Sequence, residues 1–259
     1  MSMFKDLYNY RELLKTNVKK DIRGKYKASF LGVLWSFINP LLQVVVYAIV
    51  FPYLLRATTD NYIVYLVTGI IPWTYFQTVL MTCVSCIKSN AGIIKKVYFP
   101  KVILPVSAMI SGFINFMISC IIILIFSLIW RTGISWHIVF VPLIAVIEGL
   151  FALGLGFMGA AWDAYLQDLE YIINFLVQLL FYGTPIVYDL TQFSGQSILF
   201  KLVELNPLTT IMNGYRDAFL YHRVPSLSGL GIVALIAIAL DVIGYAIFKH
   251  LEKGFAEQF

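Results

Sequence analysis

Six apolar stretches, each long enough to cross a lipid bilayer as a helix, occupy most of the 259 residues. A membrane-spanning helix needs roughly 17–25 mainly apolar residues, and lipid offers no hydrogen-bond partner to an open sheet edge or an irregular loop. We therefore expect an all-α polytopic membrane protein that forms one membrane domain over residues 1–259. The expected transmembrane helices are residues 30–55, 62–86, 102–130, 138–162, 171–188 and 230–248.

Charged residues are few and lie mostly on one side of this map. They make up 13% of the chain, whereas a soluble domain carries about 25%. Of the 19 Lys and Arg residues, 14 precede the first span, separate the second from the third or follow the sixth. The positive-inside rule places that side, and both termini, in the cytoplasm of a multi-pass inner or plasma membrane protein. This topology accounts for the net charge of +5, which does not indicate nucleic-acid binding.

Residues 1–29 predict a cytoplasmic amphipathic helix on the inner membrane surface. Leu7, Leu14, Val18 and Ile22 recur at helical spacing, and lysines fall on the rest of the helical wheel. Such a helix either anchors the chain to anionic lipid or contacts a partner or a substrate headgroup.

Polar and aromatic residues interrupt the first span. Asn39 and Pro40 predict a bent or broken helix, because proline removes a backbone hydrogen bond and disfavours helical geometry at the preceding residue. Gln43, Tyr47 and Phe51 then follow on one face. A stripe of this kind is either a seam between helices or the wall of a transport pathway.

Two carboxylates, Glu148 and Asp241, lie deepest in the apolar spans. An ionisable group near mid-membrane is by default a functional hypothesis. No intramembrane Lys or Arg is placed to pair with either one. They are candidates for a proton relay, or for protonated or water-bridged structural groups that face the bundle interior. Small residues from Gly149 to Ala161 predict that the fourth span packs closely against its neighbours.

Two connecting segments do not have the composition of ordinary loops. Residues 89–101 are basic with apolar residues between the charges, which predicts a short amphipathic helix that lies in lipid or docks onto a soluble partner. Residues 189–228 are too apolar for a solvated loop and too short to span. Short re-entrant or interfacial helices are expected there, on the outer side between spans five and six, with an interruption at Asn206-Pro207.

The sequence lacks the motifs of several enzyme classes. No G-x-x-x-x-G-K-[ST], H-E-x-x-H or G-x-S-x-G pattern occurs. The histidines are far apart, and Cys83 and Cys86 lie in an apolar span without further ligands, so we expect no metal site. We expect no catalytic residues either. Transport is the predicted class, and its energy source must lie on another subunit.

Six segments, taken together in order and spacing, resemble the membrane subunit of ABC-type polysaccharide exporters. These are permeases that move O-antigen, capsule or teichoic acid on lipid carriers. Each segment alone is a weak signature, but the set extends along the whole chain. The pattern departs at Leu166-Gln167, where a basic residue is expected beside the aspartate. The matching segments are Arg23–Pro40, Lys96–Pro105, Tyr165–Tyr171, Gly183–Tyr188, Asn206–Thr209 and Tyr215–Asp217.

The resemblance implies a set of partners. The chain would pair with a second copy of itself, and each copy would bind a separate cytoplasmic ABC ATPase. ATP and Mg²⁺ would sit on that ATPase, so this chain would hold no cofactor. Residues 89–101 would be the coupling helix seated in the ATPase. The coupling residues would be Ile93, Ile94, Lys95, Lys96, Tyr98, Phe99 and Pro100.

The resemblance also implies where the substrate lies. Arg23, Lys25 and Lys27 would meet the pyrophosphate headgroup of a lipid-linked glycan, although basic residues at this position also serve topology. Residues 189–228 would form the outer gate. Aromatic rings would line the channel, because they offer sugar rings a flat contact with few rotatable bonds. The channel candidates are Tyr47, Phe51, Phe181 and Tyr182.

Three other functions fit parts of the sequence. A permease of similar architecture could export a small drug or a lipid. An ion-coupled secondary transporter would use Glu148 and Asp241 instead of ATP, and neutral replacements there would abolish transport. An intramembrane enzyme of lipid-linked sugar metabolism would turn over substrate without ATP.

Overall fold

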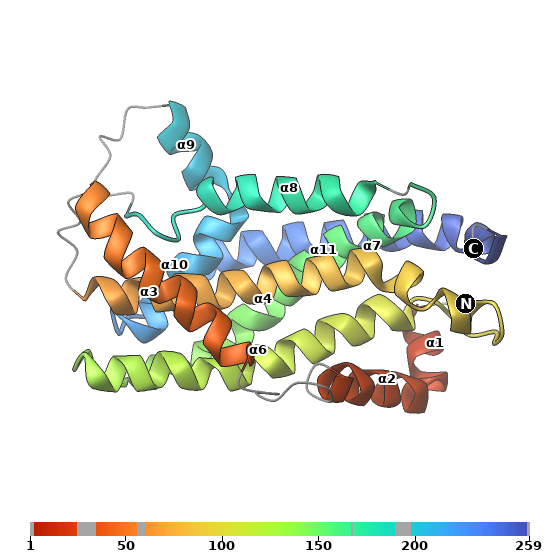
Figure 1. Ribbon diagram of the computed structural model, residues 1–259, viewed down its shortest axis with the longest axis horizontal. Coiled ribbons are helices and arrows are strands. Elements are labelled where there is room, and N and C mark those ends of the chain that lie inside the picture. The colour runs from red at the N-terminus through yellow and green to blue at the C-terminus, as the bar shows by residue number, and fades with distance from the viewer. Residues whose placement is uncertain (1–2, 25–34, 56–60, 167, 190–197, 258–259) are drawn as a thin grey trace.

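The computed structural model describes residues 3–24, 35–55, 61–166, 168–189 and 198–257. These residues form helices joined by turns and short irregular segments, with no strand among them, which confirms the all-α prediction. Four helices build the centre of the molecule and lie along its long axis in Figure 1. They are α4 (Tyr62–Ser89), α6 (Ile103–Ile129), α7 (Val141–Asp163) and α11 (Leu227–Leu251).

These four are the helices, among the described residues, that are long and apolar enough to cross a membrane. A 3₁₀ turn at Trp136–Phe140 leads into α7, and another at Glu252–Glu257 continues α11. Two further helices, α3 (Trp35–Leu55) and α8 (Leu169–Tyr182), contribute the shorter apolar stretches Leu41–Val50 and Leu169–Tyr182. The described residues therefore support four of the six predicted spans.

The remaining helices lie at the two ends of this bundle. Both chain termini lie at one end, together with α1 (Met3–Asn9), α2 (Arg11–Gly24) and α5 (Ala91–Ile94) (Figure 1). At the opposite end lie α9 (Ile198–Leu205) and α10 (Pro207–Phe219). The bundle thus separates the predicted coupling segment from the predicted outer segment.

Glycines bring α7 against its neighbours, as its small residues predicted. A Cβ atom added at Gly154 would lie 2.8 Å from the backbone nitrogen of Asp241 in α11, and one at Gly244 would meet the carbonyl oxygen of Gly154. On the α4 side, a Cβ at Gly156 would lie 2.5 Å from that of Cys83. Backbones this close leave no room for a side chain, so van der Waals packing between helices is dense here.

Several predicted helix limits differ from the structure. The N-terminal segment is two helices with a break at Tyr10 rather than one. Of the bend or break predicted at Asn39 and Pro40, a break is excluded, because α3 continues through both residues. The helix in residues 89–101 is only α5, four residues long. The fifth apolar helix ends at Tyr182 rather than at residue 188. Proline at 185 lacks an amide hydrogen and disfavours helix in the residue before it, which accounts for that early end.

Candidate functional site

The predicted coupling segment is an exposed ridge with two buried anchors. Ile94 and Phe99 are buried in the core, whereas Tyr98 between them in sequence is 86% exposed. Burial of the Phe99 ring beside the exposed Tyr98 ring fixes which side of the segment faces the core. Among the predicted contact residues, those exposed are Ile93, Lys95, Lys96 and Tyr98, and Pro100 is half-buried.

Side chains from distant parts of the chain hold this segment at both ends. At its start, Lys20 Nζ of α2 donates to Asn90 Oδ1 at 3.1 Å. At its end, the backbone N–H of Lys101 donates to Glu252 Oε1 at 2.9 Å, and Lys249 Nζ lies 2.6 Å from the other carboxylate oxygen of Glu252. The N-terminal and C-terminal helices therefore both contact the coupling segment.

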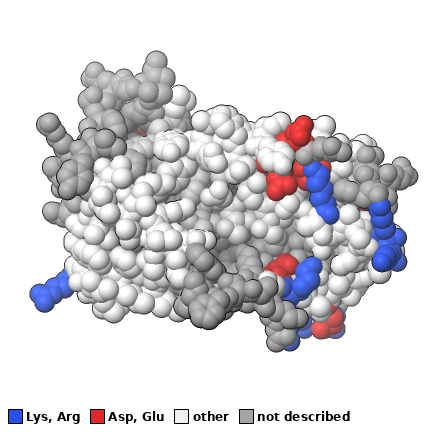
Figure 2. All heavy atoms as spheres, in the orientation of Figure 1, with Lys and Arg blue, Asp and Glu red and all other residues white. Residues whose placement is uncertain are grey.

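A further ion pair fixes the helix that leads into the segment. Lys88 Nζ lies 2.8 Å from Asp163 Oδ1 and donates to the carbonyl oxygen of Leu166 at 3.1 Å. It joins the ends of α4 and α7. Most charged side chains on the face shown in Figure 2 gather at this end, and the flanks of the bundle are uncharged. A hollow of about 900 Å³ lies here between α1, residues 98–101 and the C-terminal segment.

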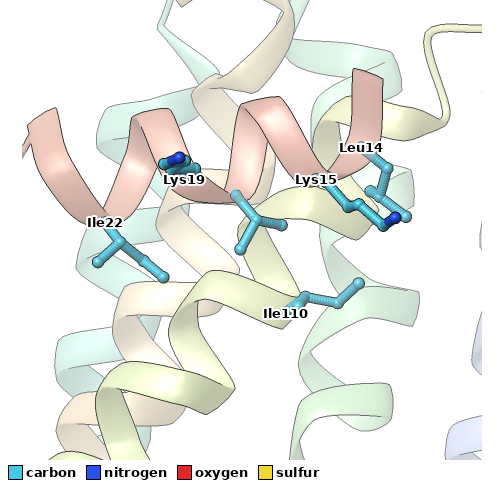
Figure 3. A pocket seen from close by; sticks show the side chains of 6 residues that line it. Leu14, Lys15, Lys19, Ile22 and Ile110 are labelled. Carbon is cyan, nitrogen blue, oxygen red and sulfur yellow. The ribbon is translucent and has the colours of Figure 1, made fainter. Parts of the chain in front are cut away.

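Helix α2 turns its apolar face toward α6, in agreement with its predicted amphipathic pattern. Figure 3 shows Leu14 and Ile22 of α2 above Ile110 of α6, around a hollow of about 360 Å³. Lys15 and Lys19 also line this hollow. The hydrogen bond and charge of Lys15 lower the pKa of Glu12, its partner at 2.9 Å on the exposed face.

The predicted headgroup residues fall almost entirely outside the described part of the chain. Lys25 and Lys27 lie outside the described residues, and so does the side chain of Arg23, although its backbone belongs to α2. Their role stays a prediction.

Three of the four predicted channel aromatics lie in one cluster. The ring of Phe181 in α8 lies 5.9 Å from that of Tyr47 in α3 and 5.3 Å from that of Tyr182, centroid to centroid. Trp73 of α4, which the sequence did not single out, lies 5.5 Å from Phe181. The side chain of Phe51 lies outside the described residues. Tyr182 is exposed, so the cluster reaches the surface of the chain.

The segment after α8 is held by side chains rather than by helical hydrogen bonds. Tyr62 and Tyr65 donate their hydroxyl hydrogens to the carbonyl oxygens of Val187 and Tyr188, both at 2.7 Å. Buried carbonyl groups outside a helix need such partners, because an unpaired one costs about 1–3 kcal/mol. The donors lie more than a hundred residues away, so neither partner is visible in the local sequence.

Two further donors complete this arrangement. Asn206 Nδ2 donates to the carbonyl oxygen of Gly183 at 3.1 Å, and Arg216 Nη2 donates to that of Ile186 at 3.0 Å. The guanidinium carbon of Arg216 lies 3.6 Å from the centre of the Tyr65 ring. A Cβ atom on Gly69 would lie 3.1 Å from Arg216 Nη2, so a glycine makes room for the cation. Arg216 is only 2% exposed, a burial that sequence reasoning missed.

The two intramembrane carboxylates have different surroundings. Glu148 is fully buried, and Tyr215 donates its hydroxyl hydrogen to Glu148 Oε2 at 2.7 Å. Asp241 lies where α11 crosses Gly154. Among the described residues no hydrogen bond joins the two carboxylates. The bond to Tyr215 favours a structural role for Glu148.

The apolar helices that are long enough to cross a membrane place the chain among polytopic helical membrane proteins. The chain belongs to the ABC-2 type transporter family, whose pattern it matches over residues 12–220. It is therefore a membrane-embedded permease. This membership removes the support for the ion-coupled alternative.

Named relatives are similar to the chain along nearly its whole length. An O-antigen export system permease protein RfbA of Myxococcus xanthus is 31% identical over 255 residues, which cover 98% of each chain. A protein of the same name from Klebsiella pneumoniae is 31% identical over 248 residues, 95% of this chain and 94% of the relative. The polysialic acid transport protein KpsM of Escherichia coli is 22% identical over 241 residues, 90% and 91% of the two chains.

Proposed function

We propose that this chain is the permease subunit of an ATP-driven exporter that moves a lipid-linked polysaccharide across the cytoplasmic membrane. The observation that carries the proposal is the full-length similarity to permeases named for O-antigen export and polysialic acid transport. The aromatic cluster of Tyr47, Trp73, Phe181 and Tyr182 supports it. Aromatic faces bind sugar rings weakly and without strict sequence preference, so a polymer can slide past them.

The energy source in this proposal is a cytoplasmic ABC ATPase that holds ATP and Mg²⁺. The chain itself contains no P-loop motif. The exposed ridge supports the partnership, because Ile93, Val97 and Tyr98 present apolar side chains among charged groups. Exposed apolar residues with a polar rim are typical of protein interfaces, in which tyrosine is enriched. Because hydrogen bonds hold the ridge at both ends, a movement of the ATPase would be transmitted through it to α4 and α6.

A second copy of the chain would complete the channel. Helices α3 and α8 expose apolar side chains such as Val46, Ile49 and Phe175, and the aromatic cluster lies between these two helices. Two copies that face each other there, each with one ATPase, would enclose a pathway lined by aromatic rings. The assembly would be a two-plus-two complex.

The proposed topology has six spans and both termini in the cytoplasm. The distribution of Lys and Arg supports it, and so does the position of both termini at one end of the bundle (Figure 1). Helices α9 and α10 would then be short re-entrant elements of an outer gate. Arg23, Lys25 and Lys27 would meet the pyrophosphate of the lipid carrier at the cytoplasmic mouth.

The other sequence-based alternatives have less support. Export of a small drug or a lipid remains compatible with the ABC-2 family, but the named relatives are polysaccharide permeases. An intramembrane enzyme would need a nucleophile beside a base, and Glu148 is instead bound to a buried tyrosine.

The decisive experiment is the Tyr98→Asp variant in cells that lack the native gene and carry the full operon. The introduced aspartate would bury a charge in the ATPase interface. Glycan export should therefore be abolished and less ATPase should copurify, while the variant still inserts into the membrane. Tyr8→Asp is the matched control, because Tyr8 is an exposed tyrosine of α1 at the same end of the molecule. Normal export by Tyr98→Asp would refute the coupling role. Absence of any lipid-linked glycan build-up in the gene deletion would refute the export function itself.

A further inference from the structure

A small polar hollow lies at the end of the bundle opposite the termini. Its volume is about 280 Å³, and it is enclosed by α4, α10, the segment after α8 and the turn after α10. This is near the lower end of the range of about 300–1,000 Å³ for ligand pockets, so it is a size for one compact unit. Side chains that line it are Tyr65, Asp189, Asn213, Arg216, Tyr221 and Arg223.

One wall of this pocket is a turn held in a single conformation. The backbone N–H groups of Tyr221 and Arg223 donate to the carbonyl oxygens of Arg216 and Asp217, both at 2.9 Å. His222 between them has φ of 52°, and its Nε2 donates to the carbonyl oxygen of Thr132 at 2.7 Å. A non-glycine residue rarely adopts positive φ and keeps it only where its surroundings enforce it. The turn therefore fixes the backbone positions from which the side chains of Tyr221 and Arg223 project.

Two arginines of the pocket have N–H groups without a hydrogen-bond partner among the described residues. Arg223 donates through Nε to Asp217 Oδ1 at 2.6 Å, and among the described residues no hydrogen bond occupies its two Nη atoms. Arg216 is bound to Ile186, but its contact with Asn213 Oδ1 is long, at 3.4 Å. Its Nε has no partner among the described residues. Buried donors of this kind are uncommon unless a ligand or water completes them.

The pocket also offers a flat apolar face and an acceptor. Tyr221 is 43% exposed, and the guanidinium of Arg223 lies 5.1 Å from the centre of its ring. Asp189 contributes a carboxylate. Sugar hydroxyls both donate and accept hydrogen bonds, so neighbouring hydroxyls can bridge a carboxylate and a guanidinium while a ring face rests on tyrosine.

We propose that this pocket binds one sugar unit of the exported glycan as it leaves the outer mouth of the permease. The proposal rests on the proposed function. The charge balance favours a sugar over a free anion, because Arg223 is paired with Asp217 and the carboxylate of Asp189 faces the same space as Arg216. Binding at this end would hold each sugar unit as it emerges and would oppose return of the polymer into the channel.

Saturation-transfer NMR on the full chain in lipid nanodiscs tests the proposal. The probes are the methyl glycosides of mannose, galactose, rhamnose and N-acetylglucosamine, together with glucuronate. We expect saturable transfer from at least one of them. Tyr221→Ala should weaken its binding roughly three- to tenfold, as expected for loss of an aromatic face.

Two additional variants keep the test independent of folding. Asn213→Ala changes an exposed side chain and should also weaken binding. Lys201→Gln removes an exposed cation of α9 outside the pocket and should leave binding unchanged. No saturable transfer from any probe would overturn the proposal, and so would a signal insensitive to Tyr221→Ala and Asn213→Ala. Displacement of every sugar signal by inorganic phosphate at equal concentration would mark an anion site and overturn it as well. Glycan export, measured in the deletion strain, reports separately on the proposed function.

Discussion

The two partners of the Lys88–Asp163 ion pair are unequally buried, so we expect their replacements to destabilise the protein by different amounts. The side chain of Lys88 is 28% exposed, whereas that of Asp163 is completely buried. Lys88→Met therefore leaves a buried carboxylate whose other oxygen, Oδ2, already lacks a hydrogen-bond partner among the described residues. Breaking a buried pair from one side costs about 3–5 kcal/mol, because the remaining charge is uncompensated.

The opposite single substitution should cost much less. Asp163→Asn keeps an acceptor for Lys88, and the lysine still reaches the carbonyl oxygen of Leu166 and solvent. We expect a loss of about 1–2 kcal/mol, because a hydrogen bond to a charged group contributes about 1.5–3 kcal/mol and is here only weakened. The double variant should recover most of the cost of Lys88→Met, because no charge is then left buried.

Unfolding in mixed micelles of mild detergent and SDS, followed by fluorescence, measures these differences. Lys15→Met is the matched control, since it breaks an ion pair with Glu12 in which both side chains are mostly exposed, and it should leave the midpoint unchanged. Equal costs for Lys88→Met and Asp163→Asn would refute the reasoning from burial. A double variant that loses the sum of the two single costs would refute it too.

Two other predictions follow from helix packing and from the carboxylates. Gly154→Ala should destabilise the protein by about 1–3 kcal/mol in the same unfolding assay, because its Cβ would meet the α11 backbone at 2.8 Å. Gly231→Ala, with open space around it, is the control and should be neutral or stabilising; equal effects would contradict the close approach. Glu148→Gln keeps an acceptor for the Tyr215 hydroxyl, so glycan export in the deletion strain should continue, and so should export by Asp241→Asn. Loss of export with normal protein levels in either variant would restore the ion-coupled hypothesis.

The spans that hydropathy located best are those whose apolar runs end at polar or charged residues. Each of four predicted spans differs by at most three residues from its helix: 62–86 from α4, 102–130 from α6, 138–162 from α7 and 230–248 from α11. The fifth was extended too far, because Ile186 and Val187 are apolar although they lie outside the helix. Hydropathy measures composition, and these two residues are buried in a non-helical segment of turns and bends.

The sequence indicated the predicted coupling segment but not which of its side chains are buried. The segment 89–101 was singled out from its mixed charge and apolar content, but its buried and exposed faces were not separated. Phe99 and Tyr98 are adjacent aromatics with opposite burial, and they follow α5 in a segment without helical periodicity that could distinguish them. Arg216 belongs to the segment 189–228, and nothing near it in sequence indicates its contacts with Tyr65 and Ile186.

The sequence by itself determined that this protein is helical and membrane-embedded, and it indicated the transporter family. The bilayer acts on contiguous windows of residues, so composition alone carries that information. Only the tertiary structure decided which buried polar groups meet, as when Tyr65 binds the carbonyl of Tyr188, 123 residues away. The convergence of Tyr47, Trp73 and Phe181 from three helices was decided in the same way. Such contacts depend on how helices pack side by side, and that packing is set by close approaches between distant residues such as Gly154 and Gly244.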